Sequence, residues 1–125
     1  MNLLLDTHVY LWWLSNPREI ADEARIAIAN PRNFVFVSAV SILEIVLKQA
    51  SGKIKPSEPP ETFLEACRFR ELPVKIAHAS AVRELPLLHK DPFDRLLASQ
   101  ALVEDMTLVT RDPMLKQYAI PIIPA

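Results

Sequence analysis

The chain has 125 residues, half of them hydrophobic and 23% charged, which excludes a disordered protein and favours a single folded domain over residues 1–125. Its formal net charge of −1 excludes a global attraction for nucleic acid, so a polyanion would have to meet a local basic patch or bound cations. Cys67 is the single cysteine, which excludes an intramolecular disulfide and a cysteine-rich zinc site.

The chain carries no pattern for membrane insertion or export. No apolar run approaches the length of about 20 residues that spans a bilayer, and the N-terminus lacks the basic region and cleavage pattern of a signal peptide. We therefore expect a soluble protein of the reducing cytoplasm, folded alone or as a small oligomer.

The first half of the chain shows apolar patterns typical of two strands and three helices. In chain order, they predict a strand at 2–5, helices at 7–14 and 20–29, a strand at 34–37 and a helix at 40–49. Ser38 or Ser41 can cap the last of these helices. Residues 51–60, with Gly52 and three prolines, are expected to form the one long surface loop.

The second half of the chain continues with helices and ends on strands. The patterns predict helices at 60–70, 77–85 and 92–104, then strands at 107–110 and 120–123. Asp91 is expected to cap the helix that Pro92 begins. Strands that alternate with helices need crossover connections, so the sequence predicts an α/β protein with a mostly parallel sheet.

Two acidic residues follow predicted strands. Asp6 comes directly after three leucines, and Asp112 follows the strand at 107–110 by two positions. Ligands of parallel sheets bind outside the carboxyl ends of the strands, so these two side chains are candidate functional residues.

Two further acids stand among apolar neighbours in predicted helices. Glu44 is surrounded by Ile, Leu and Val, and Asp94 lies between Phe93 and Arg95, just before two leucines. A carboxylate in such surroundings is costly unless it has a cation or a hydrogen-bonding partner. We therefore expect Asp6, Glu44, Asp94 and Asp112 to form one constellation.

Each acid also has a structural alternative. Asp6 and Asp112 could be simple caps, and Asp94 could be favourable first-turn charge in its helix. Glu44 could lie on a solvated stripe and pair with Lys48, four residues further on.

The glycine content limits how a phosphate could be bound. Gly52 is the single glycine and lies in the predicted loop, which excludes the glycine-rich phosphate cradles of P-loop and dinucleotide-binding folds. Clustered carboxylates instead suit Mg²⁺ or Mn²⁺, ions that can activate water and neutralise a phosphodiester during its displacement.

Several basic residues flank the acids and could contact an RNA backbone on either side of the scissile phosphate, although such residues are usually plain surface. They are Lys48, Lys53, Lys55, Arg95 and Arg111, with Lys90 nearby. Trp12 and Trp13 are adjacent and cannot both face inward, and core packing or a dimer contact is favoured over base stacking for either ring. His8, His78 and His89 show no paired metal-ligand spacing, and we expect structural or surface roles for them.

Four segments together resemble the successive motifs of the bacterial PIN-domain proteins of the VapC type. They are residues 3–8 (Leu-Leu-Leu-Asp-Thr-His), 38–45 (Ser-Ala-Val-Ser-Ile-Leu-Glu-Ile), 89–95 (His-Lys-Asp-Pro-Phe-Asp-Arg) and 108–112 (Leu-Val-Thr-Arg-Asp). The resemblance covers nearly the whole chain in the family's order, and it implies a three-layer α/β/α sandwich around a parallel sheet.

The resemblance also implies an activity and partners. Asp6, Glu44, Asp94 and Asp112 match the family's four acidic positions in an Mg²⁺- or Mn²⁺-dependent endoribonuclease site, and Thr110 matches a supporting polar position. Asp6, Asp94 and Glu44 would anchor one ion, and Asp112 would complete that site or help to hold a second ion. The family further implies a homodimer and inhibition by a VapB-type antitoxin protein.

Two other functions remain open at this stage. A phosphatase or phosphoacceptor would use Asp6 as a covalent nucleophile, although the second aspartate of haloacid-dehalogenase-like phosphatases is missing after it. A non-catalytic α/β regulatory scaffold would use its acids only for caps and ion pairs, and it would not bind Mn²⁺ in a saturable manner.

Overall fold

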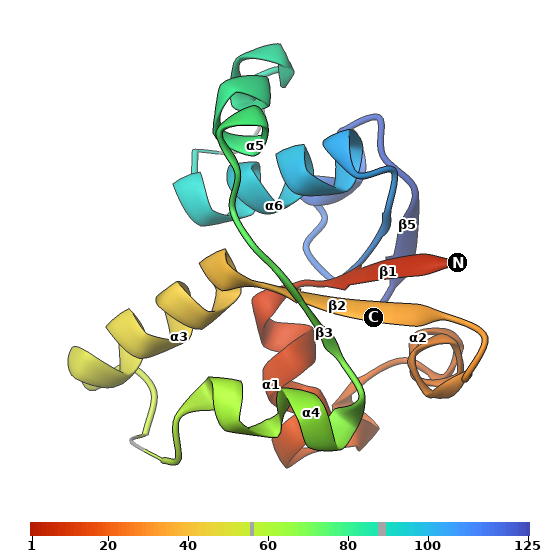
Figure 1. The fold of residues 1–125 in the computed structure, drawn as a ribbon, viewed down its shortest axis with the longest axis vertical. Helices are drawn as coiled ribbons and strands as arrows, with labels where there is room; N and C mark the ends of the chain where they lie inside the picture. Colours follow the sequence, from red (N-terminus) through yellow and green to blue (C-terminus); the bar gives the residue numbers. More distant parts are fainter. Residues whose placement is uncertain (56, 88–89) are drawn as a thin grey trace.

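Over the described residues, the chain forms one parallel sheet of five strands in the order β3-β2-β1-β4-β5 (Figure 1). The computed structural model describes residues 1–55, 57–87 and 90–125. The strands are β1 (Asn2–Leu5), β2 (Phe34–Ser38), β3 (Arg70–Leu72), β4 (Thr107–Thr110) and β5 (Ile122–Pro124). Because all of them run in the same direction, their carboxyl ends meet at one edge of the sheet.

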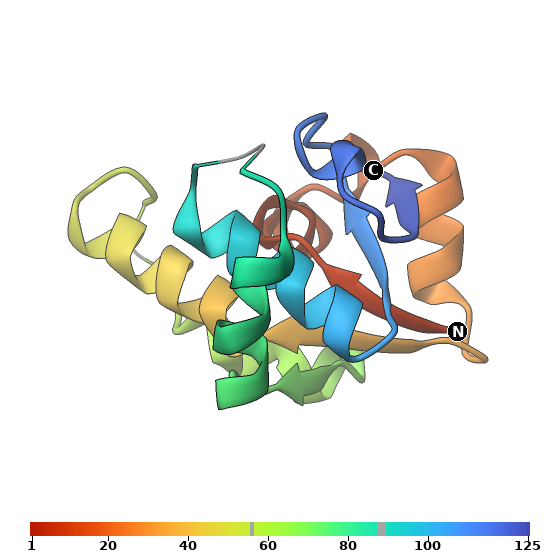
Figure 2. The same cartoon turned by 90° about the horizontal axis from the view of Figure 1, so that it is seen from above.

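Helices cover both faces of this sheet (Figures 1 and 2). One face carries α1 (Thr7–Ser15), α2 (Asp22–Ala29) and α4 (Leu64–Cys67), and the other carries α5 (Ile76–Ala81) and α6 (Pro92–Val103). Helix α3 (Ala39–Ala50) begins directly after β2 and runs outward from the sheet. Short 3₁₀ helices lie at Pro17–Glu19, Pro60–Phe63, Val82–Glu84 and Leu115–Gln117. The predicted three-layer α/β/α sandwich is confirmed.

Two apolar clusters hold the layers together. In β1, Leu3 and Leu5 point to the cluster under α1 and α2, whereas Leu4 points to the cluster under α6. All three are fully buried, as expected for a parallel strand that is covered on both faces. A continuous run of leucines is therefore compatible with a strand because each face of the sheet has its own core.

The predicted helix at 60–70 is correct only in part. Residues 60–67 are helical, as the 3₁₀ helix Pro60–Phe63 followed by the short helix α4, and the strand β3 begins at residue 70. Arg68 adopts a left-handed φ of 60°, which ends α4, and β3 then pairs with the edge of β2. The strand β3 forms because it can pair with the open hydrogen-bonding edge of the sheet. The local apolar pattern gives no information about that distant edge.

Smaller corrections concern element boundaries. The predicted helix at 77–85 is divided into α5 and the 3₁₀ helix Val82–Glu84, and the predicted strand at 120–123 is the shorter β5, displaced toward the C-terminus. The helix predicted at 20–29 begins two residues later, at Asp22. The loop prediction at 51–60 includes Pro56, which lies outside the described residues.

A buried polar network joins helices α3 and α6. The Ser38 hydroxyl accepts from the backbone N–H of Val40, at the start of α3, and donates to Gln100 Oε1 of α6 over 2.6 Å. Gln100 Nε2 donates to the Pro73 carbonyl. Since α3 carries Glu44 and α6 carries Asp94, this network fixes the relative position of two predicted site residues.

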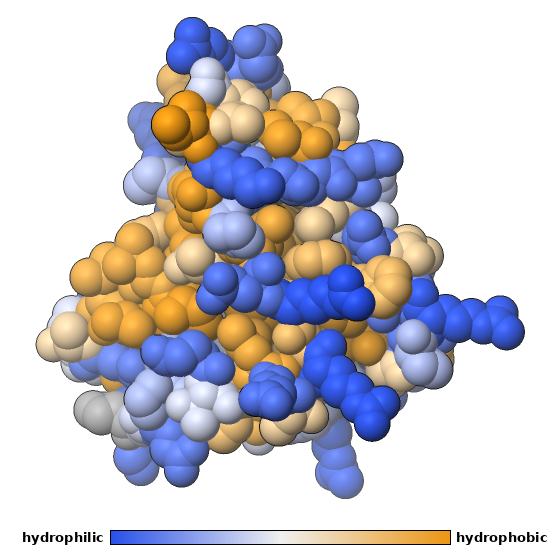
Figure 3. Space-filling view, in the orientation of Figure 1, coloured by the Kyte–Doolittle hydropathy of each residue, from blue (hydrophilic) through white to orange (hydrophobic). Residues whose placement is uncertain are grey.

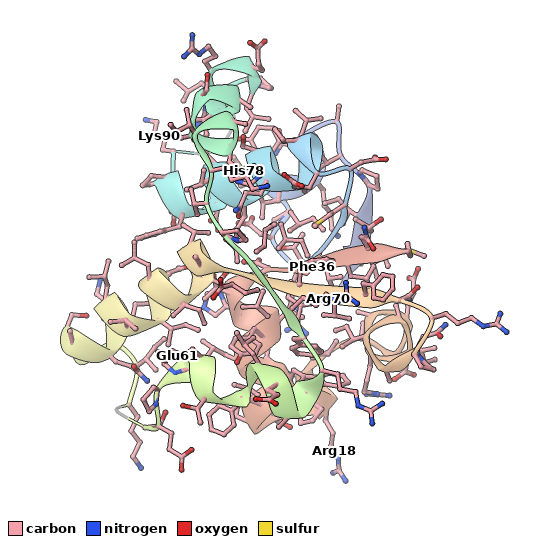
Figure 4. The ribbon with its side chains drawn as sticks, viewed as in Figure 1. Arg18, Phe36, Glu61, Arg70, His78 and Lys90 are labelled. Carbon is pink, nitrogen blue, oxygen red and sulfur yellow. The ribbon has the colours of Figure 1, made fainter. Side chains whose placement is uncertain are left out.

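His78 has the structural role that was expected for it. It lies on α5 facing α6 (Figure 4), is fully buried, and its Nε2 lies 2.7 Å from Glu104 Oε2. His89, by contrast, lies outside the described residues. None of the described helices has the length and apolar composition that a bilayer crossing requires.

Candidate active site

A cavity of about 330 Å³ lies where β1, β4 and the first turns of α1 and α6 meet. It is lined by all four predicted acids, by the cap residue Asp91, and by a group of other side chains, namely His8, Trp12, Lys48, Arg111 and Pro113. The parallel sheet brings Asp6 and Asp112 to this edge from strand ends, and α3 and α6 contribute Glu44 and Asp94. The predicted constellation is therefore assembled in one place.

Asp6 is held by two donors at the base of this cavity. Its Oδ1 accepts from the backbone N–H of Thr7 over 2.7 Å, and its Oδ2 accepts from the Thr110 hydroxyl over 2.6 Å. Asp6 thus caps α1, as the structural alternative predicted, and also lines the cavity. The cap and the functional position are the same residue because α1 starts at the carboxyl end of β1.

Burial raises the pKa of the Asp6 carboxyl group above its ordinary value. The hydrogen bonds from Thr110 and Thr7 and the nearby His8 oppose this rise, while the negative charge of Glu44 adds to it. With no cation present, the pocket therefore disfavours the charged form of Asp6.

Glu44 is the most deeply placed acid on a helix. The residue is 5% exposed, although the neighbouring Leu43 and Leu47 on α3 are each 49% exposed. Glu44 Oε2 accepts from Lys48 Nζ over 2.8 Å, whereas Oε1 is buried and has no hydrogen-bond partner among the described residues. The predicted Lys48 pair exists, but the solvated stripe is wrong because the exposed face of α3 is apolar.

Asp94 and Asp112 complete the acidic lining from opposite sides of the sheet edge. Asp94 is half-buried in the first turn of α6, which Asp91 caps by accepting from the backbone N–H of Phe93. Asp112 Oδ1 accepts from the backbone N–H of Met114, and the backbone N–H of Asp112 donates to the Thr110 hydroxyl. Thr110 therefore connects Asp6 and Asp112 directly.

The predicted basic residues separate into two groups. Lys48 and Arg111 line the cavity, whereas Lys53 and Lys55 are exposed in the segment after α3 and are not part of its lining. Arg95 lies elsewhere, donating to the backbone carbonyls of Val82, Leu85 and Pro86. Its guanidinium group ties the start of α6 to the preceding 3₁₀ helix.

The sequence patterns did not predict that His8 and Trp12 line the cavity. Trp13 packs against Phe69 with ring centroids 6.0 Å apart, while Trp12 lines the acidic cavity beside His8. His8 and Trp12 are four residues apart on α1, and residues at this spacing share a helix face. The spacing from the strand-end Asp6 could have indicated that both side chains point toward the site.

The donor set suits a hard divalent cation. All four acids offer carboxylate oxygens, the ligands that Mg²⁺ and Mn²⁺ prefer, and the buried Glu44 Oε1 has no partner among the described residues. Among the residues that the structure describes, no group of three Asp, Glu, His or Cys side chains is already arranged to hold an ion. An Mg²⁺ ion in a protein is typically bound by one or two direct carboxylate ligands and keeps several waters.

Comparisons with known proteins found a family model and a related sequence that cover most of the chain. A family model described as PIN domain matches residues 3–121. The chain is 29% identical over 122 residues to Ribonuclease VapC22 of Mycobacterium tuberculosis, and this match covers 95% of the chain and 93% of that protein.

The fold has close counterparts among solved structures. One match is a chain of VapBC2 from Rickettsia felis, in a crystal structure with a DNA fragment from the VapBC2 promoter. It has a TM-score of 0.73 and 20% identity, and the match covers 99% of this chain and 98% of that chain. A chain of DNA-bound VapBC from Salmonella typhimurium matches with a TM-score of 0.69 and 16% identity over the same shares of the two chains. At these identities, the likeness concerns the fold.

Proposed function

Because this chain belongs to the PIN domain family, we propose that it is a metal-dependent endoribonuclease and the toxin of a VapBC-type toxin–antitoxin pair. The observation that carries this proposal is the convergence of Asp6, Glu44, Asp94 and Asp112 on one cavity. The name of its relative, Ribonuclease VapC22, supports the same activity. We assign these four residues as the catalytic and metal-binding acids of a single domain spanning residues 1–125.

Asp6, Glu44 and Asp94 would hold the Mg²⁺ or Mn²⁺ ion, with Asp112 completing the site or helping to hold a second ion. A divalent ion in such a site supplies Lewis acidity, neutralising charge on the phosphodiester and lowering the pKa of water. The expected products carry 5′-phosphate and 3′-hydroxyl ends.

The chain's own residues prepare the cavity for this chemistry. The Thr110 hydroxyl and the Thr7 N–H orient both oxygens of Asp6 before substrate arrives. Lys48 holds one oxygen of Glu44, and the other oxygen remains available to a cation. Hydrogen bonds of this kind fix the orientation of individual ligands before an ion and a phosphodiester enter.

Positive charge at the cavity wall would position the RNA backbone. Lys48 and Arg111 line the cavity beside the acids, so they can contact phosphates on either side of the scissile bond. Lys53 and Lys55 follow α3 on the surface and would contact RNA further from the cut. Arg95 would act indirectly, through the backbone carbonyls it binds.

We further propose a VapB-type antitoxin partner, a homodimer and action in the cytoplasm. Solved structures with this fold include VapBC complexes. The outer part of α3 carries exposed apolar side chains at Leu43, Val46 and Leu47 (Figure 3), a surface suited to contact with another protein.

The test is cleavage of defined RNAs by the purified protein with Mn²⁺, with EDTA, and in the Asp6→Asn and Asp94→Asn variants. We expect cleavage only with Mn²⁺ and loss of cleavage in both variants, with Mn²⁺ binding followed separately by isothermal titration. Asp105→Asn is the matched control, because Asp105 lies in the turn before β4, at the other end of that strand, and its positive φ of 55° suits Asn.

Two outcomes would contradict the proposal. A protein without saturable Mn²⁺ binding would be the non-catalytic scaffold, and a trapped aspartyl-phosphate at Asp6 would indicate the phosphatase.

A further inference from the structure

An aromatic and guanidinium surface lies beside the acidic cavity. The rings of His8 and Trp12 have centroids 5.9 Å apart and planes inclined by 34°. The Arg111 guanidinium carbon lies 4.2 Å from the centroid of the Trp12 ring. We refer to these three side chains as the stacking platform, and all three line the cavity together with the acids.

The platform is fixed in place from outside the cavity. Arg111 Nε donates to the backbone carbonyl of Ala125 over 3.1 Å, and an Nη donates to the backbone carbonyl of Glu19. The Glu19 carboxylate lies 3.7 Å from the other Nη. Arg111 is therefore held against the Trp12 ring by Ala125 and by Glu19, in the 3₁₀ helix that follows α1, so ordering it for a ligand costs little entropy.

Trp12 has an unusual position for so large an apolar side chain. It is only half-buried, and it borders a cavity whose other walls are mainly carboxylates and cations. Trp13, the adjacent residue on α1, is equally half-buried, but it packs against Phe69 and does not line this cavity. Of the two rings, Trp12 is therefore the one available to a ligand that combines a flat apolar face with charged groups.

A nucleotide has this combination of chemical properties. Its phosphate is suited to the cation-bridged acids, and its base has a π face that stacks on aromatic rings and on guanidinium planes. A base that is paired in a duplex is stacked on its neighbours and is not available for such a contact.

We propose that His8, Trp12 and Arg111 form a binding subsite for an unpaired nucleobase adjacent to the scissile phosphate. This inference rests on the proposed nuclease function and deepens it: Trp12 makes the main stacking contact, and Arg111 and His8 extend the surface. The subsite selects RNA in which the base next to the cut is unpaired.

The test compares normal and abasic RNA. A short labelled single-stranded RNA that the parent protein cuts is prepared in three forms: intact, and abasic on either side of the cut. We measure KM and kcat with Mn²⁺ for the parent, Trp12→Phe and Trp12→Leu. Trp13→Leu is the matched control because Trp13 does not line the cavity, and melting temperature and Mn²⁺ binding verify that every variant is folded.

We expect Trp12→Leu to raise KM for the intact RNA by about tenfold with little change in kcat, and Trp12→Phe to retain most of the parent's affinity. For the parent, KM for one of the two abasic RNAs should be about tenfold higher than KM for the intact RNA. The Trp12→Leu variant should no longer distinguish that abasic RNA from the intact one. This loss of discrimination is a result that a purely structural role of Trp12 would not produce.

A binding measurement separates this inference from the proposed activity. Anisotropy of the labelled intact RNA is measured with Ca²⁺ in the Asp94→Asn background, with and without Trp12→Leu. If Trp12→Leu weakens RNA binding by about tenfold, and this difference persists at high salt, the result supports stacking. A phosphate contact would instead weaken with salt. Equal binding with and without Trp12→Leu, or unchanged discrimination between intact and abasic RNA, overturns the platform, whereas a parent protein that cuts no RNA overturns the nuclease function.

Discussion

Thr110 donates a hydrogen bond of 2.6 Å to Asp6, although 104 residues separate them in the chain. The same hydroxyl oxygen accepts from the backbone N–H of Asp112 over 3.0 Å. One side chain at the end of β4 therefore orients the acid at the end of β1 and the loop that carries another acid. Neighbouring parallel strands make this contact possible because they end at the same edge.

Replacing Thr110 by Val should impair the site while nearly preserving the shape of the side chain. We expect Mn²⁺ affinity to fall by about 10- to 100-fold, because the hydroxyl group orients Asp6. The free energy of unfolding should fall by about 1–3 kcal/mol, because the buried Asp6 carboxylate loses a donor and the half-buried N–H of Asp112 loses its acceptor. Isothermal titration and denaturant unfolding measure the two effects. Thr110→Ser is the control that restores both, and a Thr110→Val protein with the parent's Mn²⁺ affinity would remove Thr110 from the site.

Asp6→Asn should stabilise the metal-free protein at neutral pH while it abolishes cleavage. Burial raises the pKa of Asp6 in the folded state, so its contribution to stability is present below the unfolded pKa and is lost as the pH rises through the folded pKa. The neutral Asn avoids this loss. We expect a higher melting temperature than the parent in EDTA at pH 7, and the reverse order once Mn²⁺ is added.

A pH series provides the internal check of that explanation. In EDTA, the difference between parent and Asp6→Asn should shrink as the pH is lowered and Asp6 becomes protonated. A constant difference across the series would assign the effect to packing around residue 6.

Lys48→Gln should weaken RNA binding and flatten its salt dependence. Lys48 lines the cavity, so we expect its loss to lower the slope of log affinity against log salt by about one. The double variant Lys53→Gln, Lys55→Gln, measured by the same anisotropy titration, should have a smaller effect because both residues lie outside the cavity. An equal or larger effect of the double variant would place the RNA along the segment after α3.

Tyr10 should make stability fall in alkaline solution. Its hydroxyl group donates to the Pro60 carbonyl over 2.6 Å, and burial raises its pKa from 10.0 to about 12. The stabilising contribution of the neutral phenol is present below pH 10.0 and is lost as the pH rises through about 12. Tyr10→Phe should cost about 1 kcal/mol at pH 8 and should show a smaller alkaline loss.

Absorbance titration of the phenolate, with Tyr118→Phe as the comparison, tests the assignment. The late ionisation step should disappear only in Tyr10→Phe. Its persistence there would contradict the assignment of this step to Tyr10.

Local sequence was sufficient for the parts of the site that lie at element boundaries. Asp6 follows an apolar strand, and Asp91 and Pro92 mark the start of α6, so their positions follow from strand and capping preferences over a few residues. The sequence pattern did not predict β3, because this strand exists only by pairing with β2, a contact between residues more than 30 positions apart. Whether a strand such as β3 pairs at the edge of the sheet depends on the assembled sheet and not on the local sequence.

The sequence by itself determined the alternation of strands and helices, the parallel sheet and the four acids, because each depends on short-range apolar periodicity or on an acid placed at a strand end. Only the tertiary structure decided that Trp12 borders the acids while Trp13 packs against Phe69, and that Lys48, rather than Arg95, lines the cavity. Such choices depend on which side chains the folded layers bring within a few ångströms of one another, and the chain's local preferences do not contain that information.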